Sequence, residues 1–195
     1  MGRRSGTSQT REAILDAAMA AFAEHGYGKT TIRGVAREAG VDPALVMHFF
    51  GTKDGLFDAA IKGGAMPIRQ LQAALDGDPG QLGERLITRY LELWSDPEQG
   101  PLMLAVITAA TSTPAAAELL KELMRGELLR PLIERLGADH PEERAVLAAT
   151  QLLGLAVLRY VIRIEPLASM PAPALVASVG PTLQRYLTGA VDFAG

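Results

Sequence analysis

The 195-residue chain is long enough for one domain or two small ones, and its 48% hydrophobic residues exclude a largely disordered protein. It contains no cysteine, which excludes disulfides, thiolate metal sites and thiol nucleophiles. Residues 1–53 hold seven Lys or Arg and five acidic residues, whereas the remainder holds 12 Lys or Arg and 17 acidic residues. The net charge of −3 is therefore unevenly distributed, and the basic N-terminal segment is suited to bind DNA.

No membrane segment is expected from the sequence. The start, MGRRSGTSQTR, is polar and lacks the apolar stretch of a secretory signal. The longest uncharged run within a predicted helix, Ala145–Leu158, has fourteen residues, which is too short to span a bilayer. We therefore expect a soluble, cytoplasmic protein with no membrane partner.

The first predicted helix covers residues 9–25. Its apolar residues recur at helical spacing and form one stripe, and Gly26 follows as a helix terminator. The stripe consists of Ala13, Ile14, Ala17, Ala18, Ala21 and Phe22. We expect this helix to support the segment that follows it.

Residues 30–57 predict two short helices joined by a tight turn, then the start of a third. Thr31 is suited to cap the first helix, and Gly40 to end it in the left-handed conformation. Asp42 is suited to cap the second helix, with Pro43 at its first position. That helix, Pro43 to about Phe50, would be roughly 12 Å long and would fit the DNA major groove. The arrangement is that of a helix-turn-helix.

These residues carry a family resemblance. Phe22, Gly26 and Tyr27, then VAREAGV at 35–41 and HFFGTKDGLF at 48–57, resemble the N-terminal DNA-binding domain of TetR-family transcriptional regulators. The resemblance covers about 50 of the 195 residues, and the remainder is similar only in length and helical character. It implies a homodimer that binds double-stranded operator DNA and responds to a small-molecule effector.

Several residues of this segment are predicted to bind DNA. Val46, Phe49 and Phe50 are expected to pack inward, which leaves an apolar surface suited to thymine methyl groups. Arg33 is the best candidate for a hydrogen-bonded base contact, and the resemblance assigns a phosphate contact to Lys53. The family commonly has a tyrosine at the position of Met47, and methionine cannot donate that hydrogen bond. The predicted DNA-binding set is Thr31, Arg33, Pro43, Ala44, Leu45, Met47, His48, Thr52 and Lys53.

The rest of the chain predicts further helices and no strands. A long fourth helix is expected from Lys53 to Leu75, interrupted by Gly63, Gly64 and Pro67, where a bend would either ease packing or transmit ligand binding. The others are predicted at residues 82–94, 102–111, 113–136, 142–164 and 174–187. The fold prediction is all-α, with about nine helices. Residues 1–53 would form the helix-turn-helix domain, and residues 54–195 the ligand-binding and dimerisation domain.

Two sets of residues in this second domain are candidate binding sites. A largely apolar effector pocket would use Tyr90, Trp94, Met103, Ile107, Thr111 and Met124, although residues of this kind at helical spacing are more often plain core. The helix at 142–164 is apolar on more than one face, so it is expected to pair with its copy and with the last helix. The predicted dimer interface is Leu152, Leu155, Val176, Val179 and Leu183.

An enzyme is not expected. His25, His48 and His140 lack the spacing of metal ligands, and no nucleophile or phosphate-loop motif is present. We therefore predict no catalytic residue, no metal and no cofactor. The predicted function is a transcriptional repressor that a small, largely apolar ligand releases from its operator. The alternative is a non-regulatory ligand-binding or scaffold dimer that retains a helix-turn-helix.

Overall fold

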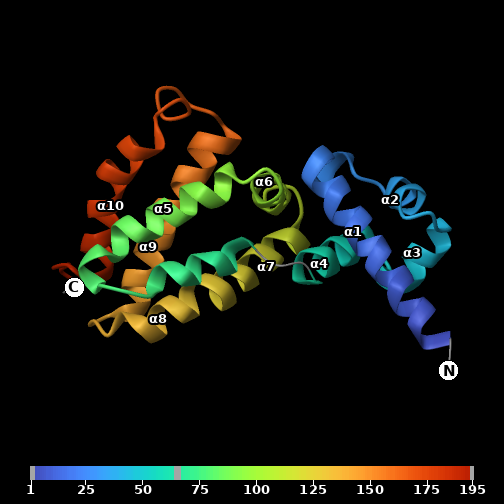
Figure 1. Ribbon diagram of the computed structural model, residues 1–195, viewed down its shortest axis with the longest axis horizontal. Helices are drawn as coiled ribbons and strands as arrows, with labels where there is room; N and C mark the ends of the chain where they lie inside the picture. Colours follow the sequence, from blue (N-terminus) through green and yellow to red (C-terminus); the bar gives the residue numbers. More distant parts are fainter. Residues whose placement is uncertain (1–2, 64–66, 194–195) are drawn as a thin grey trace. The chain divides into compact units, whose positions relative to one another are not determined.

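A computed structural model describes residues 3–63 and 67–193, and all regular structure within them is helical (Figure 1). The all-α prediction is confirmed, with ten α-helices in the described residues in place of about nine. Contacts divide the chain into two compact units. One comprises residues 1–66 and 101–120, and the other residues 67–100 and 121–195. This division differs from the predicted boundary after residue 53, because the helix that begins there packs on the first helix.

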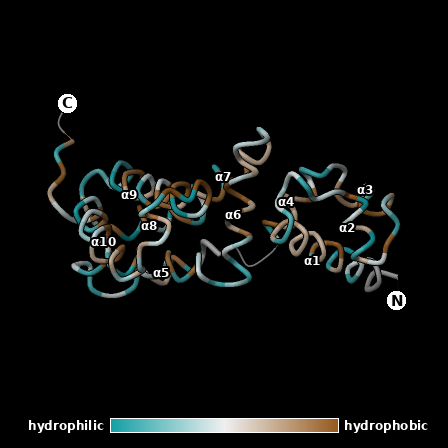
Figure 2. The backbone as a smooth tube through the Cα atoms, turned by 90° about the horizontal axis from the view of Figure 1, so that it is seen from above, coloured by the Kyte–Doolittle hydropathy of each residue, from teal (hydrophilic) through white to brown (hydrophobic). Residues whose placement is uncertain are grey.

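The first unit is built around helix α1, Arg3–Lys29. Helices α2 (Ile32–Glu38) and α4 (Lys53–Gly63) pack against α1, and α3 (Pro43–Phe50) packs against both α2 and α4. Apolar and polar residues alternate around α1, as in a helix that buries one side (Figure 2). The unit also contains most of α6 (Gln99–Ala110) and most of α7 (Pro114–Leu123). Its fully buried side chains include Ile14, Phe22, Val46, Leu56 and Ile61.

The path of α1 changes at Gly26, where the sequence predicts the helix to end. Gly26 has φ 73° and ψ 167°, and helical geometry resumes up to Lys29. Thr30 follows and is buried, and its hydroxyl lies 2.8 Å from the carbonyl oxygen of Gly26, which accepts its hydrogen bond. This bond fixes the direction in which the chain enters α2.

The second unit has α5 (Leu82–Ser95), α8 (Arg130–Leu136), α9 (Pro141–Ala156) and α10 (Ala172–Thr188). Turns of π type link α7 to α8 at Met124–Leu129 and extend α9 at Val157–Val161. The helix predicted from Lys53 to Leu75, with an interruption at Gly63, Gly64 and Pro67, corresponds to two elements in the structure. Helix α4 ends at Gly63, and Pro67–Leu75 is a 3₁₀ segment of the second unit. Part of the predicted bend, residues 64–66, lies outside the described residues.

Helix α9 and its π-type extension form one long apolar stretch that corresponds to the helix predicted at residues 142–164. Pro141–Val161 has 21 residues with a mean hydropathy of 1.3, which by length and composition alone would suffice to cross a membrane. One such helix is weak evidence, because a core helix of a soluble protein passes the same test. In this unit α9 packs against α8 and α10, and its Arg144 is buried.

Helices α5 and α10 lie side by side at very short range (Figure 1). The Gly83 N–H donates to the Gln184 side-chain oxygen at 2.8 Å, and the Gln184 amide donates to the Pro79 carbonyl at 2.8 Å. A β-carbon at Gly83 would lie 2.4 Å from both the Gln184 nitrogen and the Gly180 oxygen, which are backbone atoms. Gly83 is therefore required by the close approach of the two helices.

We expect Gly83→Ala to lower the free energy of unfolding by about 2–4 kcal/mol, because the helices must separate to admit the methyl group. Urea unfolding followed by circular dichroism measures this change. Gly126→Ala is the matched control, since a β-carbon there meets nothing within 4 Å. Equal stabilities for the two variants would show that α5 and α10 are not held at this distance.

Candidate nucleic-acid interface

The caps predicted for α2 and α3 are present. The Thr31 hydroxyl accepts a hydrogen bond from the Gly34 N–H at 3.1 Å. The Asp42 carboxylate accepts one from the Ala44 N–H at 2.7 Å. Gly40 has φ 66°, the left-handed conformation that residues with a β-carbon rarely adopt. Local side-chain chemistry thus sets where each helix of the helix-turn-helix begins and ends.

Helix α3 presents the surface that the sequence predicts. Val46 is fully buried, whereas Phe49 and Phe50 are half-buried. Met47 is 50% exposed, so its side chain is accessible on the outer side of the helix. The exposed or half-exposed residues of α3 outside the packed side are Pro43, Ala44, Leu45, Met47 and His48. Arg33 is also exposed, on α2, so these side chains are accessible to DNA, and their contact with bases stays a prediction.

Lys53 lies at the N-terminus of α4, where unpaired backbone N–H groups favour an anion. Its Nζ donates to the Gly28 carbonyl at 3.3 Å and lies 4.3 Å from the centroid of the Tyr27 ring. Burial lowers the pKa of the Lys53 ammonium, and the neighbouring Asp54 carboxylate opposes that shift. Thr52 caps α4 by accepting from the Gly55 N–H at 3.0 Å, so its own hydroxyl proton remains available to a phosphate oxygen.

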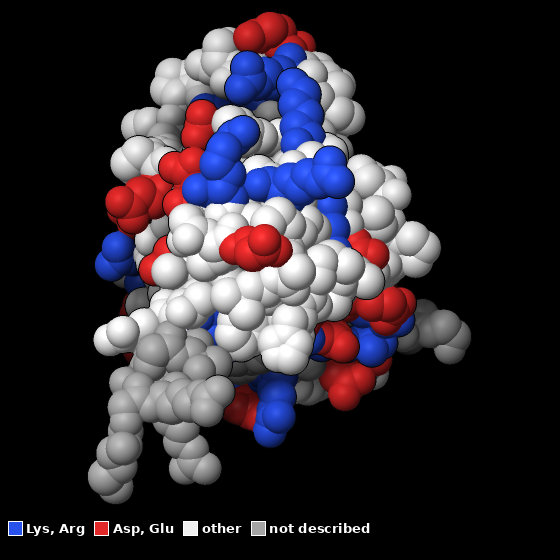
Figure 3. All heavy atoms as spheres, turned by 90° about the vertical axis from the view of Figure 1, so that its right-hand side faces the viewer, with Lys and Arg blue, Asp and Glu red and all other residues white. Residues whose placement is uncertain are grey.

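Positive charge gathers on the face of the first unit that carries α1–α3. In Figure 3 a group of Lys and Arg side chains lies in the upper part of the visible face, with Asp and Glu side chains around and below it, and a few further Lys and Arg side chains lie apart from the group. Lys29, Arg33 and Arg37 are exposed members of this unit, and Lys53 is half-buried. A local excess of cations attracts DNA even though the whole chain is acidic.

Sequence reasoning missed the surroundings of Lys53. Tyr27 served only to support the family resemblance, yet the structure places its ring directly against the Lys53 ammonium. The Tyr27 hydroxyl donates to the Asp54 carboxylate. Burial, followed by this hydrogen bond, raises the pKa of Tyr27 to about 12. The sequence separation of 26 residues between Tyr27 and Lys53 gives no local signal for this contact.

The predicted effector residues are only partly brought together. Tyr90 and Trp94 are buried in edge-to-face contact with centroids 6.1 Å apart, and Trp94 stacks on Tyr160 at 4.3 Å. The Tyr90 hydroxyl donates to the Leu152 carbonyl at 2.7 Å, as a core side chain would. The remaining candidates are Met103 and Met124, both half-buried, Ile107, which is buried, and Thr111, which is exposed. Met103, Ile107 and Thr111 belong to the first unit, whereas the other three belong to the second.

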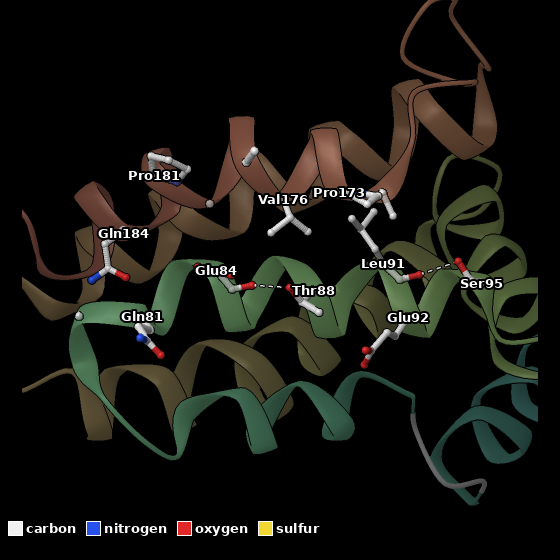
Figure 4. A pocket seen from close by; sticks show the side chains of 14 residues that line it. Gln81, Glu84, Thr88, Leu91, Glu92, Ser95, Pro173, Val176, Pro181 and Gln184 are labelled. Atoms are coloured by element: carbon white, nitrogen blue, oxygen red, sulfur yellow. Dashed lines mark hydrogen bonds between the residues drawn. The ribbon is translucent and has the colours of Figure 1, made fainter.

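A groove of about 890 Å³ runs between α5 and α10. Leu91 points from α5 toward Val176 and Pro173 of α10, and these three residues give the groove an apolar wall (Figure 4). Glu84, Thr88, Glu92 and Gln184 supply polar groups along it, and its lining contains no Lys or Arg. A volume of this size falls within the range of sites for small molecules.

The predicted dimer interface needs correction. Leu152, Leu155 and Leu183 are only 2%, 7% and 0% exposed, so they belong to the core of the second unit, and the prediction that they form an interface is wrong. Val176 and Val179 are half-buried, and Val176 lines the groove with α5. The large apolar side chains that are exposed on α9 and directly after it are Val146, Leu153, Leu158, Val161, Ile162 and Ile164.

Within the described part of the chain, no group of three or more His, Cys, Asp or Glu side chains is placed to hold a metal ion. The candidate functional groups of this chain are instead the exposed side chains of α3 and the Lys and Arg side chains of the first unit.

Comparisons with known proteins cover both parts of the chain. Residues 14–60 match the family described as "Bacterial regulatory proteins, tetR family", and residues 80–187 match "Tetracyclin repressor-like, C-terminal domain". The chain is 31% identical over 173 residues to the HTH-type transcriptional regulator BetI of Agrobacterium fabrum, covering 85% of this chain and 84% of that protein.

Solved structures show the same fold. The TetR-family regulator SCO0857 of Streptomyces coelicolor is similar with a TM-score of 0.62 and 35% identity, covering 96% of this chain and 99% of that one. The multidrug binding protein EbrR, complexed with imidazole, has a TM-score of 0.74 and 24% identity, covering 95% and 93%. The chain therefore belongs to the TetR family of DNA-binding transcriptional regulators.

Proposed function

We propose that this regulator is a cytoplasmic, homodimeric repressor that binds operator DNA through α3 and leaves it when a small, largely apolar molecule binds the second unit. The observation that carries the DNA-binding part is the exposed apolar side of α3, with Met47 half exposed, beside Arg33 and Lys53. Together these side chains offer methyl contacts for thymine and cationic groups for phosphate.

Gel-shift assays with the DNA upstream of its own gene test this proposal. The purified protein is expected to shift that DNA at nanomolar concentration and an unrelated duplex only at much higher concentration. Transcription from the same promoter in vitro should fall as the protein is added. Equal affinity for both duplexes would contradict operator recognition, and increased transcription would contradict repression.

Lys53→Ala is expected to weaken binding to operator and unrelated DNA by similar factors, because a phosphate contact carries no base information. One lost phosphate contact should also make the plot of log affinity against log salt shallower by about one unit. Fluorescence-anisotropy titrations at four salt concentrations measure this slope. An unchanged slope would show that Lys53 does not contact a phosphate.

The dimer is proposed to form through the exposed apolar face of α9. Val146 and Leu153 of α9 are seven residues apart, which is close to two helical turns, so they lie on one side of the helix. Val161 is the last residue of the π-type extension of α9. The side chains of Val146, Leu153 and Val161 are 48%, 37% and 36% exposed. Two α9 helices related by a two-fold axis would cover these side chains from water. Gly154, also exposed on α9, would permit close approach.

The groove between α5 and α10 is proposed as the effector site. Its wall of Leu91, Pro173 and Val176 suits an apolar molecule, and Glu84 and Gln184 would orient polar groups of that molecule. The ligand must bind one arrangement of the dimer better than the other for release to follow. The groove residues replace the sequence-based set, of which Tyr90 and Trp94 are core side chains.

Val176→Trp is expected to fill this groove and to weaken binding of the apolar dye N-phenyl-1-naphthylamine by at least tenfold. The indole occupies space that the wild-type groove leaves open. Dye fluorescence upon titration with protein gives the affinity. Ala174→Trp is the control, since Ala174 is exposed on α10 outside the groove. The groove is not the dye site if Val176→Trp and Ala174→Trp bind the dye equally well.

A further inference from the structure

The Lys53 ammonium has a defined place before any DNA is bound. It lies against the face of the Tyr27 ring, and one of its N–H groups donates to the Gly28 carbonyl. A lysine ammonium carries three donors, so two remain for a further acceptor. The long flexible side chain of lysine normally loses rotamer freedom when it binds. Because Tyr27 and Gly28 already restrict the Lys53 side chain in the free protein, less rotamer freedom remains to be lost when it binds a phosphate.

The Tyr27 ring is itself held in place from several directions. It is 8% exposed, stacks on Phe22 with centroids 5.9 Å apart, and meets Phe57 edge to face at 5.0 Å. Its hydroxyl is anchored by the Asp54 carboxylate, and Asp54 directly follows Lys53 in the first turn of α4. Two aromatic contacts and a hydrogen bond therefore fix both the tilt and the rotation of the ring.

The Tyr27 ring, held by these contacts, is a rigid binding surface for a cation. A positive group within about 6 Å of a tyrosine centroid is attracted by the negative face of the ring. At 4.3 Å, Lys53 satisfies this condition, and it does so at the end of α4 that favours an anion. The same atoms thus hold the lysine and direct it to a place where a phosphate is favoured.

We infer that Tyr27 is a positioning residue for DNA binding: its ring, fixed by Phe22, Phe57 and Asp54, sets the Lys53 ammonium for a DNA phosphate at the N-terminus of α4. The inference rests on the proposed phosphate contact of Lys53. Tyr27 is buried, so it contributes to affinity without touching DNA. Removing the ring should therefore act only through Lys53.

A double-mutant cycle tests this dependence. Operator affinity is measured by anisotropy at four salt concentrations for the wild type, Tyr27→Leu, Lys53→Ala and the double variant. We expect Tyr27→Leu to lower affinity three- to tenfold and to make the salt slope shallower by up to one unit. The double variant should bind no more weakly than Lys53→Ala. Tyr27→Phe keeps the ring and should keep the slope of the wild type.

Ile14→Ala is the control, because Ile14 is fully buried in the same unit and is not one of the residues that fix the Tyr27 ring. If it lowers stability as much as Tyr27→Leu yet leaves the salt slope unchanged, loss of packing alone does not explain the Tyr27 effect. Losses that add fully in the double variant would overturn the inference. If Lys53→Ala itself leaves the slope unchanged, the phosphate contact is wrong. If Lys53→Ala changes the slope but Tyr27→Leu has no effect, Lys53 contacts a phosphate and Tyr27 does not position it.

A second measurement needs no variant in the core. In the wild-type protein, the protons beside the Lys53 ammonium should resonate upfield because they lie over the Tyr27 ring. Nuclear magnetic resonance of isotope-labelled lysine, assigned with Lys53→Ala, reports this shift in free and operator-bound protein. An upfield shift that persists on DNA supports positioning, and one that disappears on DNA contradicts it.

Discussion

Replacing both Leu153 and Val161 by glutamate is expected to turn the proposed dimer into a monomer and to lower operator affinity at least a hundredfold. Each substitution enters the symmetric interface twice, so four carboxylates would be placed among apolar side chains. Burying an unpaired charge costs several kcal/mol, or the interface separates to avoid it. A hundredfold loss corresponds to about 2.7 kcal/mol, less than the cost of one such burial.

Analytical ultracentrifugation at micromolar protein measures the assembly state, and gel shift measures operator binding. A monomer binds a single half-site, which explains why both properties should change together. Ala117→Glu is the control, because it adds the same charge at an exposed position of α7, which is not the proposed interface helix. A double variant that stays dimeric would exclude the α9 face as the interface. A monomer with wild-type affinity would show that one copy is sufficient for operator binding.

The helix-turn-helix could be predicted because its signals are local. Thr31, Gly40 and Asp42 act on backbone groups within three residues of themselves, so their capping roles depend little on the rest of the fold. The inward position of Val46 follows from helical spacing in the same way. The TetR-family resemblance drew on this segment, and the match at residues 80–187 extends it to a part of the chain without any motif recognisable in the sequence.

The binding surfaces of the second unit could not be predicted, and the reason is visible in α9. Its sequence is apolar on nearly every side, so periodicity does not show which side meets the core. Tertiary contacts decide it: α10 packs on α9, and the Tyr90 hydroxyl bonds to the Leu152 carbonyl. Leu152 and Leu155 therefore turn inward, while Leu153 stays exposed. The π-type turn at Val157–Val161 further shifts the positions after it, which a regular period does not anticipate.

The contact between Lys53 and the Tyr27 ring was not predicted for a related reason. The family resemblance assigned a phosphate contact to Lys53, and sequence reasoning identified no residue that holds its side chain. The contact with Tyr27 depends on α1 and α4 packing together, and that packing brings Phe22 and Phe57 into T-shaped contact at 4.8 Å. Local rules therefore identify candidate DNA-binding residues, whereas the contact between Tyr27 and Lys53 depends on the folding of the whole unit.

Arg33→Ala is expected to relax sequence preference more than it lowers overall affinity. The reading surface of α3 is poor in side chains that recognise base edges by hydrogen bonds, so Arg33 on α2 is the best placed candidate for one. An arginine that binds a guanine edge through two hydrogen bonds contributes about 1–3 kcal/mol of discrimination against the wrong base.

A panel of operator duplexes with single base-pair changes measures this effect by competition. Arg33→Ala should bind one or two of the changed duplexes as well as the original, a pattern that identifies the base pair read by Arg33. Arg37→Ala is the matched control, since Arg37 is exposed on the same helix one turn later and is expected to affect all duplexes alike. A uniform loss for Arg33→Ala across the panel would assign Arg33 to the DNA backbone. Specificity would then have to come from methyl contacts of Ala44 and Met47 and from DNA shape.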